Sequence, residues 1–269
     1  MSQPRVLILH ADGSNRDHEA AQAFEAAGAA AEIVHINQLR AQEKRWDTYQ
    51  ILALPGGFTY ADALGSGKLW ALDLNTYFSE EVHAFVESGK PVIGICNGFQ
   101  ALVKSGILPS PLSGRGAGGE GRATLTFNAE GHFECRWVVL KPQSQLCLWT
   151  RGLSDLIECP VAHGEGRFLL NEPGDLTVLA AHDQIALLYA RADGGAANGA
   201  YPINPNGSIG DIAGVCNPRG NVLGLMPHPE DHIAAYQHPR WTRVERGRGE
   251  SGRLGLRLFE NGVKYARER

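Results

Sequence analysis

The sequence predicts an α/β protein whose central sheet is mostly parallel and covered by helices on both faces. In the first hundred residues, short β-rich runs alternate with helical patterns. The β-rich runs are apolar throughout, which is typical of parallel strands buried on both faces. Gly28 and Gly89 follow two of the helical patterns, as the residue after a helix often does. We therefore expect three layers, helix, sheet and helix.

The first half supplies the parallel strands in order. Strands are expected in RVLILH (5–10), AEIVHI (31–36), ILAL before Pro55 and PVIGI up to Ile95. Helices are expected over His18–Ala27, in FSEEVHAFVESG (78–89) and in FQALVKSG (99–106).

The second half adds further strands to what we expect to be a single domain over residues 1–269. LPSPLSGRGAGGEGR (108–122) is dense in Gly, Pro and Ser, so it is interpreted as a flexible loop or insertion. After it, the runs ATLTF, FECRWVVL, FLL, LTVLAAH and IALLYA are interpreted as strands, mostly antiparallel or mixed additions to the sheet.

Residues 240–269 form a basic tail, with nine Lys or Arg against four Asp or Glu. Two interpretations remain open: a solvated helix near LRLFENGVKYA, or a surface that contacts a partner or a phosphate.

Composition excludes several classes of function. The chain has 25 Lys plus Arg and 29 Asp plus Glu, so there is no overall electrostatic case for nucleic-acid binding. The apolar run Val6–Leu9 is far shorter than a signal-peptide core or a membrane span, and we expect a cytoplasmic protein without membrane contact. Five cysteines without a C-x-x-C pair argue against a disulfide framework and a zinc knuckle.

The segment PVIGICNGFQALVKSG predicts a nucleophile. An apolar strand leads to Cys96 in the frame Gly94-x-Cys96-x-Gly98, and a helix follows. Flanking glycines allow the sharp turn of a nucleophile elbow, and a helix N-terminus favours the thiolate. A buried structural cysteine between glycines is the alternative.

The segment LGLMPHPED supplies a candidate base. His228 and Glu230 alternate after an apolar strand, and in extended chain they share a face, so Glu230 can fix the tautomer of His228. A histidine beside prolines without a catalytic role is the alternative. We predict a triad of Cys96, His228 and Glu230.

The segment ILALPGGFTYAD supplies a candidate oxyanion site. Gly56 and Gly57 let the backbone approach a ligand closely, so the N–H of Gly57 is expected to complete an oxyanion hole with the N–H of Asn97. An ordinary turn after a strand is the alternative.

We expect no metal and no cofactor in this chain. His228, Glu230 and His232 are not in the order H-E-x-x-H, and the prolines around His228 prevent the helix that would align two histidine ligands. GSGKL (65–69) does not satisfy the phosphate-binding loop pattern, so no ATP site is expected.

The three site segments, in this order and spacing, resemble the class I (triad) glutamine amidotransferases, a flavodoxin-like family. There, the PGG loop, the G-x-C-x-G-x-Q elbow and the H-x-E pair form a glutaminase site. ADGSNRDHEAAQAFEAAGA, PGGFTYADALGSGKLWA, ATLTFNAEGHFECRWV and VAHGEGRF further resemble the glutaminase subunits of phosphoribosylformylglycinamidine synthases.

The resemblance implies more residues and partners. Gln100 matches a glutamine that helps to hold the substrate, and His163, Gly164, Glu165 and Gly166 are expected to line the glutamine pocket. It also implies ammonia transfer to a separate synthetase subunit that uses ATP and Mg²⁺ to convert formylglycinamide ribonucleotide to the amidine, with a small bridging subunit.

Two features depart from the family pattern. The first turn usually carries Asn-Cys-Asp and here is Asn15-Arg16-Asp17, and the Gly-rich stretch 113–121 is extra length. Other interpretations of the chain are another class I amidotransferase, a stand-alone cysteine hydrolase of the same fold, or a binding or regulatory module without catalysis.

Overall fold

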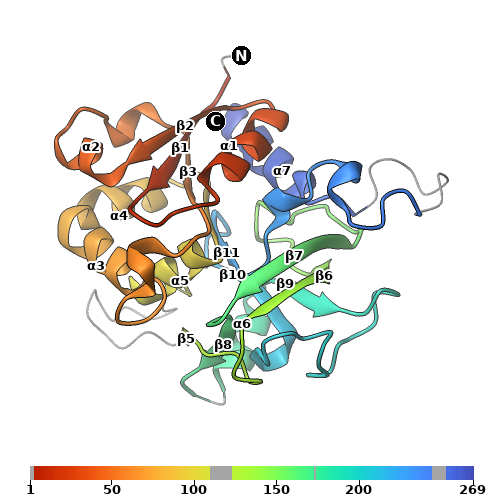
Figure 1. The fold of residues 1–269 in the computed structure, drawn as a ribbon. Helices are drawn as coiled ribbons and strands as arrows, with labels where there is room; N and C mark the ends of the chain where they lie inside the picture. The colour runs from red at the N-terminus through yellow and green to blue at the C-terminus, as the bar shows by residue number, and fades with distance from the viewer. Residues whose placement is uncertain (1–2, 110–122, 173, 244–252) are drawn as a thin grey trace.

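A nine-stranded mixed sheet organises the molecule (Figure 1). The computed structural model describes residues 3–109, 123–172, 174–243 and 253–269. Within these residues, the strand order is β2-β1-β3-β4-β11-β10-β9-β6-β7, and β5 and β8 form a separate two-stranded sheet.

One half of the large sheet is parallel and the other is antiparallel. The parallel strands are β2 (Ala30–His35), β1 (Arg5–His10), β3 (Ile51–Leu54), β4 (Val92–Ile95) and β11 (Val222–Leu225). The antiparallel strands are β10 (Ile212–Cys216), β9 (Ile185–Ala190), β6 (Glu134–Pro142) and β7 (Ile157–His163). The last strand of the chain, β11, thus returns to lie directly beside β4.

Helices cover both faces of the parallel half. Figure 1 shows α1 (Asp17–Ala26) and α7 (Leu256–Arg267) on one side, and α3 (Lys68–Tyr77), α4 (Ser79–Glu87) and α5 (Asn97–Lys104) on the other. A short helix, α2 (Ile36–Arg40), follows β2. Apart from Arg5 and His10 at the ends of β1, strands β1, β3, β4 and β11 are apolar and buried because helices lie on both of their faces. The expected three-layer fold is confirmed.

The second half differs from the sequence prediction in three places. LTVLAAH, expected as a strand, forms most of the helix α6 (Asp175–Ala181). Leu176 and Leu179 pack against the core at helical spacing while Thr177 is exposed, so the prediction of a strand was wrong. ATLTF and FLL do form strands, but as β5 (Ala123–Thr126) and β8 (Arg167–Leu170) of the small sheet. The strands β7 and β10 were not predicted, and in the first half neither were the helices α2 and α3.

Most of the expected Gly-rich loop lies outside the described residues, which end at residue 109 and resume at 123. Within the described part of the chain, no helix is both long and apolar enough to cross a membrane.

The basic tail contains the expected helix, but only one face of it is solvated. Leu258, Phe259 and Val263 of α7 are buried, and Phe259 packs edge-on against Phe24 of α1 at 5.0 Å between ring centroids. The Arg267 guanidinium donates to the Gly28 carbonyl at the end of α1. Cations at helix C-termini bind free carbonyl groups and the negative end of the helix dipole. Part of the excess charge therefore serves docking within the chain.

Gly262 permits the close contact between α7 and Trp149. A Cβ at position 262 would lie 2.2 Å from Cζ3 of the fully buried Trp149 ring. Gly262→Ala gains up to about 1 kcal/mol of helix propensity and incurs about 1–3 kcal/mol of overpacking. We expect a net loss of about 1 kcal/mol in the free energy of unfolding, measured by urea denaturation. Gly174→Ala is the matched control, because its Cβ meets nothing within 4 Å. A stabilised Gly262→Ala variant would contradict the packing argument.

Candidate active site

Cys96 stands on a sharp turn between β4 and α5. Its backbone has φ +50° and ψ −106°, a conformation that side-chain-bearing residues rarely adopt. The turn is held by the N–H of Cys96, which donates to Leu225 O at 2.8 Å, and by its carbonyl, which accepts from the N–H of Gln100 at 3.0 Å. Strain of this kind persists only where neighbouring structure enforces it and is common at active sites.

Two glycines make the turn sterically possible. A Cβ at Gly98 would lie 2.0 Å from Leu54 O, and one at Gly94 would lie 2.8 Å from Gly98 O. Because these contacts are with backbone atoms, neither position has room for a side chain. The expected elbow geometry is therefore present, with Cys96 at the carboxyl edge of the parallel strands.

His228 and Glu230 lie together beside Cys96, on the segment that follows β11. The distance from His228 Nδ1 to Glu230 Oε1 is 2.7 Å, and both side chains are almost fully buried. The local conformation differs from the expected extended chain, because Pro229–Asp231 forms a 3₁₀ turn. Proline fixes its own φ near the helical value, which favours this turn, and the His–Glu contact forms across it.

The surroundings favour a charged His228. Burial by itself disfavours the imidazolium, but the Glu230 carboxylate and then Cys96 raise the pKa of His228 well above its usual value. A cationic imidazole next to the thiol stabilises the thiolate form that nucleophilic attack requires.

The loop after β3 packs against the same imidazole. A Cβ at Gly56 would lie 2.6 Å from His228 Cε1, and Gly57 has φ +148°, a region that glycine adopts without strain. The loop is tied to the elbow by the N–H of Thr59, which donates to Asn97 Oδ1 at 3.1 Å. As the first residue of α5, Asn97 has a backbone N–H without an intrahelical acceptor. Both candidate oxyanion donors thus belong to segments that meet at the elbow.

Gln100 connects the elbow to the expected glutamine pocket. Its Nε2 donates to Glu165 O at 2.7 Å, and its Oε1 accepts from Asn97 Nδ2 at 3.0 Å. The Glu165 carboxylate in turn accepts from the N–H of Ser66 at 3.2 Å. The buried Gln100 side chain therefore holds the segment of residues 163–166 in place.

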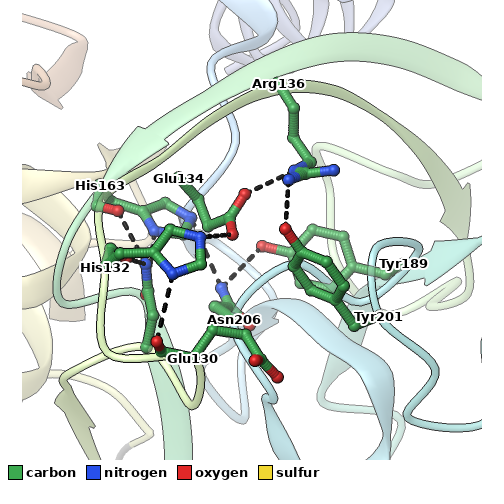
Figure 2. A network of polar contacts seen from close by, with 9 residues as sticks. Glu130, His132, Glu134, Arg136, His163, Tyr189, Tyr201 and Asn206 are labelled. Atoms are coloured by element: carbon green, nitrogen blue, oxygen red, sulfur yellow. Dashed lines mark hydrogen bonds and ion pairs between the residues drawn. The ribbon is translucent and has the colours of Figure 1, made fainter.

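His163 and its neighbours form a buried polar network, shown in Figure 2. Asn128 Nδ2 donates to His163 O at 2.8 Å, and Asn128 Oδ1 accepts from the N–H of Gly166 at 2.9 Å. Asn206 Nδ2 donates to Gly166 O at 2.8 Å and to the Tyr189 hydroxyl at 3.1 Å. The two asparagines thus fix the backbone on both sides of Gly164 and Glu165.

The same network fixes the protonation state of His163. Its Nδ1 lies 3.2 Å from Asn128 Oδ1, which only accepts. Its Nε2 lies 3.5 Å from Asn206 Nδ2, a donor whose two hydrogens are shared with the shorter bonds to Gly166 O and the Tyr189 hydroxyl. Burial, followed by the charge of His228, lowers the pKa of His163 to about 3. His163 is therefore neutral with its proton on Nδ1.

Sequence reasoning missed the two asparagines. Asn128 stands within the TFN motif and Asn206 within Asn206-Gly207-Ser208, which has the form of a glycosylation site. A buried polar side chain is not distinguishable from an exposed one by type alone, so neither position carried a structural signal.

The buried carboxylate of Glu134 lies next to this network. Glu134 on β6 pairs in register with His163 on β7, and its buried carboxylate lies 2.8 Å from His132 Nε2 and 2.5 Å from Arg136 Nε. Arg136 Nη2 donates to the Tyr201 hydroxyl at 2.6 Å. The buried charge is thus compensated by the Arg136 guanidinium, as burial of a carboxylate requires.

His232 is turned away from the triad. Its Nδ1 lies 2.6 Å from Glu158 O, and its ring lies edge-on to Trp137 at 5.0 Å. His232 therefore does not lie with His228 and Glu230 as a third candidate metal ligand. The absence of a metal stays a prediction.

An α/β sheet that presents a cysteine on a strand-to-helix elbow, next to a buried His–Glu pair, has the architecture of the nucleophile-elbow enzymes. Residues 3–266 match the CobB/CobQ-like glutamine amidotransferase domain, and the chain belongs to that family.

Relatives and a solved structure match along the whole chain. The chain is 53% identical to the phosphoribosylformylglycinamidine synthase subunit PurQ of Treponema denticola, over 98% of this chain and 99% of the relative. Identity to the subunit of the same name from Dehalococcoides mccartyi is 44%, over 100% of both chains. A chain in the structure of PurLQS from Thermotoga maritima superposes with a TM-score of 0.72 at 28% identity, covering 98% of this chain and 99% of that one.

The neutral, buried His163 predicts a loss of stability in acid. The unfolded chain binds a proton at this residue near pH 6.5, whereas the folded chain does so only near pH 3. The free energy of unfolding therefore falls as the pH falls from about 6.5 toward 3, by at most about 1.4 kcal/mol per pH unit from this group. In His163→Asn this dependence should be shallower than in the wild type, measured by urea denaturation at several pH values. The exposed His83→Asn is the control, and an unchanged slope in His163→Asn would refute the assignment.

Proposed function

We propose that this chain is the glutaminase subunit of phosphoribosylformylglycinamidine synthase. It hydrolyses glutamine and passes the ammonia to the synthetase subunit, which converts formylglycinamide ribonucleotide to the amidine in purine biosynthesis. One observation carries the proposal: Cys96 lies on an elbow beside the buried His228–Glu230 pair, in a chain 53% identical to a PurQ subunit over nearly its full length.

Cys96 is the nucleophile and His228 is the proton carrier of this reaction. The thiol proton passes to His228, and the sulfur adds to the side-chain amide carbon of glutamine. When the C–N bond breaks, His228 returns the proton to the departing nitrogen, which leaves as ammonia. Water then attacks the glutamyl thioester and releases glutamate. Glu230 orients the imidazole and stabilises its charge, at 2.7 Å from Nδ1.

The backbone donors of Gly57 and Asn97 stabilise the oxyanion of both tetrahedral intermediates. One such donor contributes roughly 3 kcal/mol to the transition state in related sites. Thr59 and Asn97 are hydrogen-bonded to each other, so the two donors keep a fixed relative position. Gln100 and the backbone of residues 163–166 hold the substrate, supported by Asn128 and Asn206.

The chain acts in a complex and without a cofactor of its own. The Thermotoga maritima structure is an assembly called PurLQS. In the corresponding complex of this chain, the synthetase subunit uses ATP and Mg²⁺, and a small third subunit bridges the two. The complex is cytoplasmic and needs neither a membrane nor a nucleic acid.

Cys96→Ala separates glutamine hydrolysis from amidine synthesis. We expect glutamate release and glutamine-dependent synthesis by the complex to fall at least about 10³-fold, because the nucleophile is lost. Synthesis from added ammonium chloride should stay at the wild-type rate, because the synthetase site is untouched. Both are measured in the complex with ATP, Mg²⁺ and formylglycinamide ribonucleotide.

The wild-type chain alone is the reference for coupling, and its glutaminase activity should be weak until the partner and the nucleotide substrate are added. Equal turnover with and without the partner would indicate a stand-alone hydrolase. No glutamate release in any mixture would indicate a binding module.

Asn128→Ala should weaken glutamine binding more than chemistry. The substitution removes the acceptor for the Gly166 N–H and the donor to His163 O, so the pocket segment loses its support. We expect KM for glutamine to rise about tenfold, the equivalent of about 1.4 kcal/mol, with kcat changed less. Steady-state kinetics of the complex measures both, and the exposed Asn75→Ala on α3 is the control. A lower kcat at constant KM would contradict a supporting role in binding.

A further inference from the structure

Arg16 lies where the loop after β1 meets two parts of the catalytic site. Its backbone N–H donates to Gly56 O at 3.2 Å. A Cβ at Gly56 would lie 3.5 Å from Arg16 Cγ and 2.6 Å from His228 Cε1. Arg16 therefore borders the same glycine that packs against the catalytic imidazole, although it is far from His228 in sequence.

The guanidinium of Arg16 reaches the turn that carries the acid of the triad. Arg16 Nη1 lies 3.0 Å from Glu19 Oε1 and 3.7 Å from Asp231 Oδ1. The Asp231 side chain is 18% exposed, so it is largely withdrawn from water. Glu19, one turn into α1, holds the guanidinium toward Asp231.

Asp231 is a second carboxylate, besides Glu230, close to the imidazole of His228. One nitrogen of His228, one carboxylate oxygen of Glu230 and one of Asp231 all lie within 4.8 Å of one another. Glu230 uses Oε1 for His228, and its buried Oε2 has no hydrogen-bond partner among the described residues. A protonated Asp231 has a hydrogen that it can donate to an acceptor such as Glu230 Oε2. That hydrogen bond would reduce the negative charge that Glu230 presents to His228.

Neighbouring groups shift the pKa of Asp231 in opposite directions. Burial, and then the charge of Glu230, raise the pKa of Asp231 to about 6, while His228 and Arg16 act in the opposite direction. Glu19 of α1 raises the pKa of Asp231 as Glu230 does, and the Cys159 thiol of β7 also lies within electrostatic reach of Asp231. Arg16 is the one permanently charged cation among these described groups.

We propose that Arg16 is a positioning residue of the glutaminase site: it holds the Asp231 carboxylate ionised and turned to the guanidinium, so that Glu230 pairs with His228 alone. This inference rests on the proposed function. It assigns a role to the position at which the chain departs from the Asn-Cys-Asp pattern of the family.

The test is the pH profile of glutamine hydrolysis by the full complex. In Arg16→Gln, the midpoint of the acidic limb of kcat/KM should move up by about one pH unit, the size expected for loss of one nearby opposite charge. Activity should then fall several-fold near pH 6.5 and approach the wild-type value above pH 8. Arg16→Lys keeps the charge and should restore most of the wild-type profile. Arg45→Gln, an exposed arginine paired only with Asp47, is the matched control and should leave the profile unchanged.

The Asp231→Ala background identifies the group through which Arg16 acts. Alanine has neither a charge nor a hydrogen to donate, so Arg16→Gln should cause no further shift in this background. Asp231→Ala alone should have a midpoint no higher than that of the wild type, a result that stays informative if Arg16→Gln does not fold.

Three results would overturn the inference: an Arg16→Gln profile that superposes on the wild type, an equal loss of activity at every pH, or an upward shift that persists without Asp231. An inactive wild-type complex would instead refute the proposed function, so the two failures are distinguishable.

Discussion

Close backbone approach between α5 and the strands below it is the constraint on which the catalytic centre depends. Gly98 has no room for a side chain because of Leu54 O, and a Cβ at Gly224 on β11 would lie 2.0 Å from the ring of Phe99. Because the helix begins so close to the sheet, the chain must turn within one residue, and Cys96 takes a positive φ to do so. The strained residue is thereby also the one whose side chain projects from the strand edge at a helix N-terminus.

Two buried histidines in this site have opposite protonation because their neighbours differ, although both are almost fully withdrawn from water. Burial alone disfavours the imidazolium in both. His228 faces the Glu230 carboxylate, which raises its pKa, whereas His163 faces the amide groups of Asn128 and Asn206, which supply one acceptor and one donor. The fold thus keeps a proton carrier and a neutral structural histidine close together. The ring nitrogens of His163 meet amide groups, and the Glu134 carboxylate that pairs in register with it is bound by Arg136.

The sequence predicted the parallel half of the fold well, because each buried strand there is an apolar run bounded by a glycine or a proline. It predicted the second half less well. LTVLAAH has strand-type composition, and only its packing shows that Leu176 and Leu179 follow a helical period. The motifs predicted a triad of Cys96, His228 and Glu230, but not the 3₁₀ turn at Pro229–Asp231, because tertiary contacts decide between a turn and extended chain. The roles of Asn128, Asn206 and Arg16 depend on long-range contacts that no local pattern encodes.

Topology explains how residues so distant in the chain reach one place. β4 and β11 are adjacent and parallel, so their carboxyl ends deliver Cys96 and His228 to the same edge of the sheet. The loops after β1 and β3 end at that edge as well, and they meet through the bridge between Ser14 and Gly57. Open parallel sheets bind their ligands at this edge. Since β11 follows the other described strands in the chain and enters the sheet between β4 and β10, the proposed base reaches Cys96 only when these distant parts of the chain pair. The proposed nucleophile and base therefore come together through the pairing of β4 with β11, two strands that lie far apart in the chain.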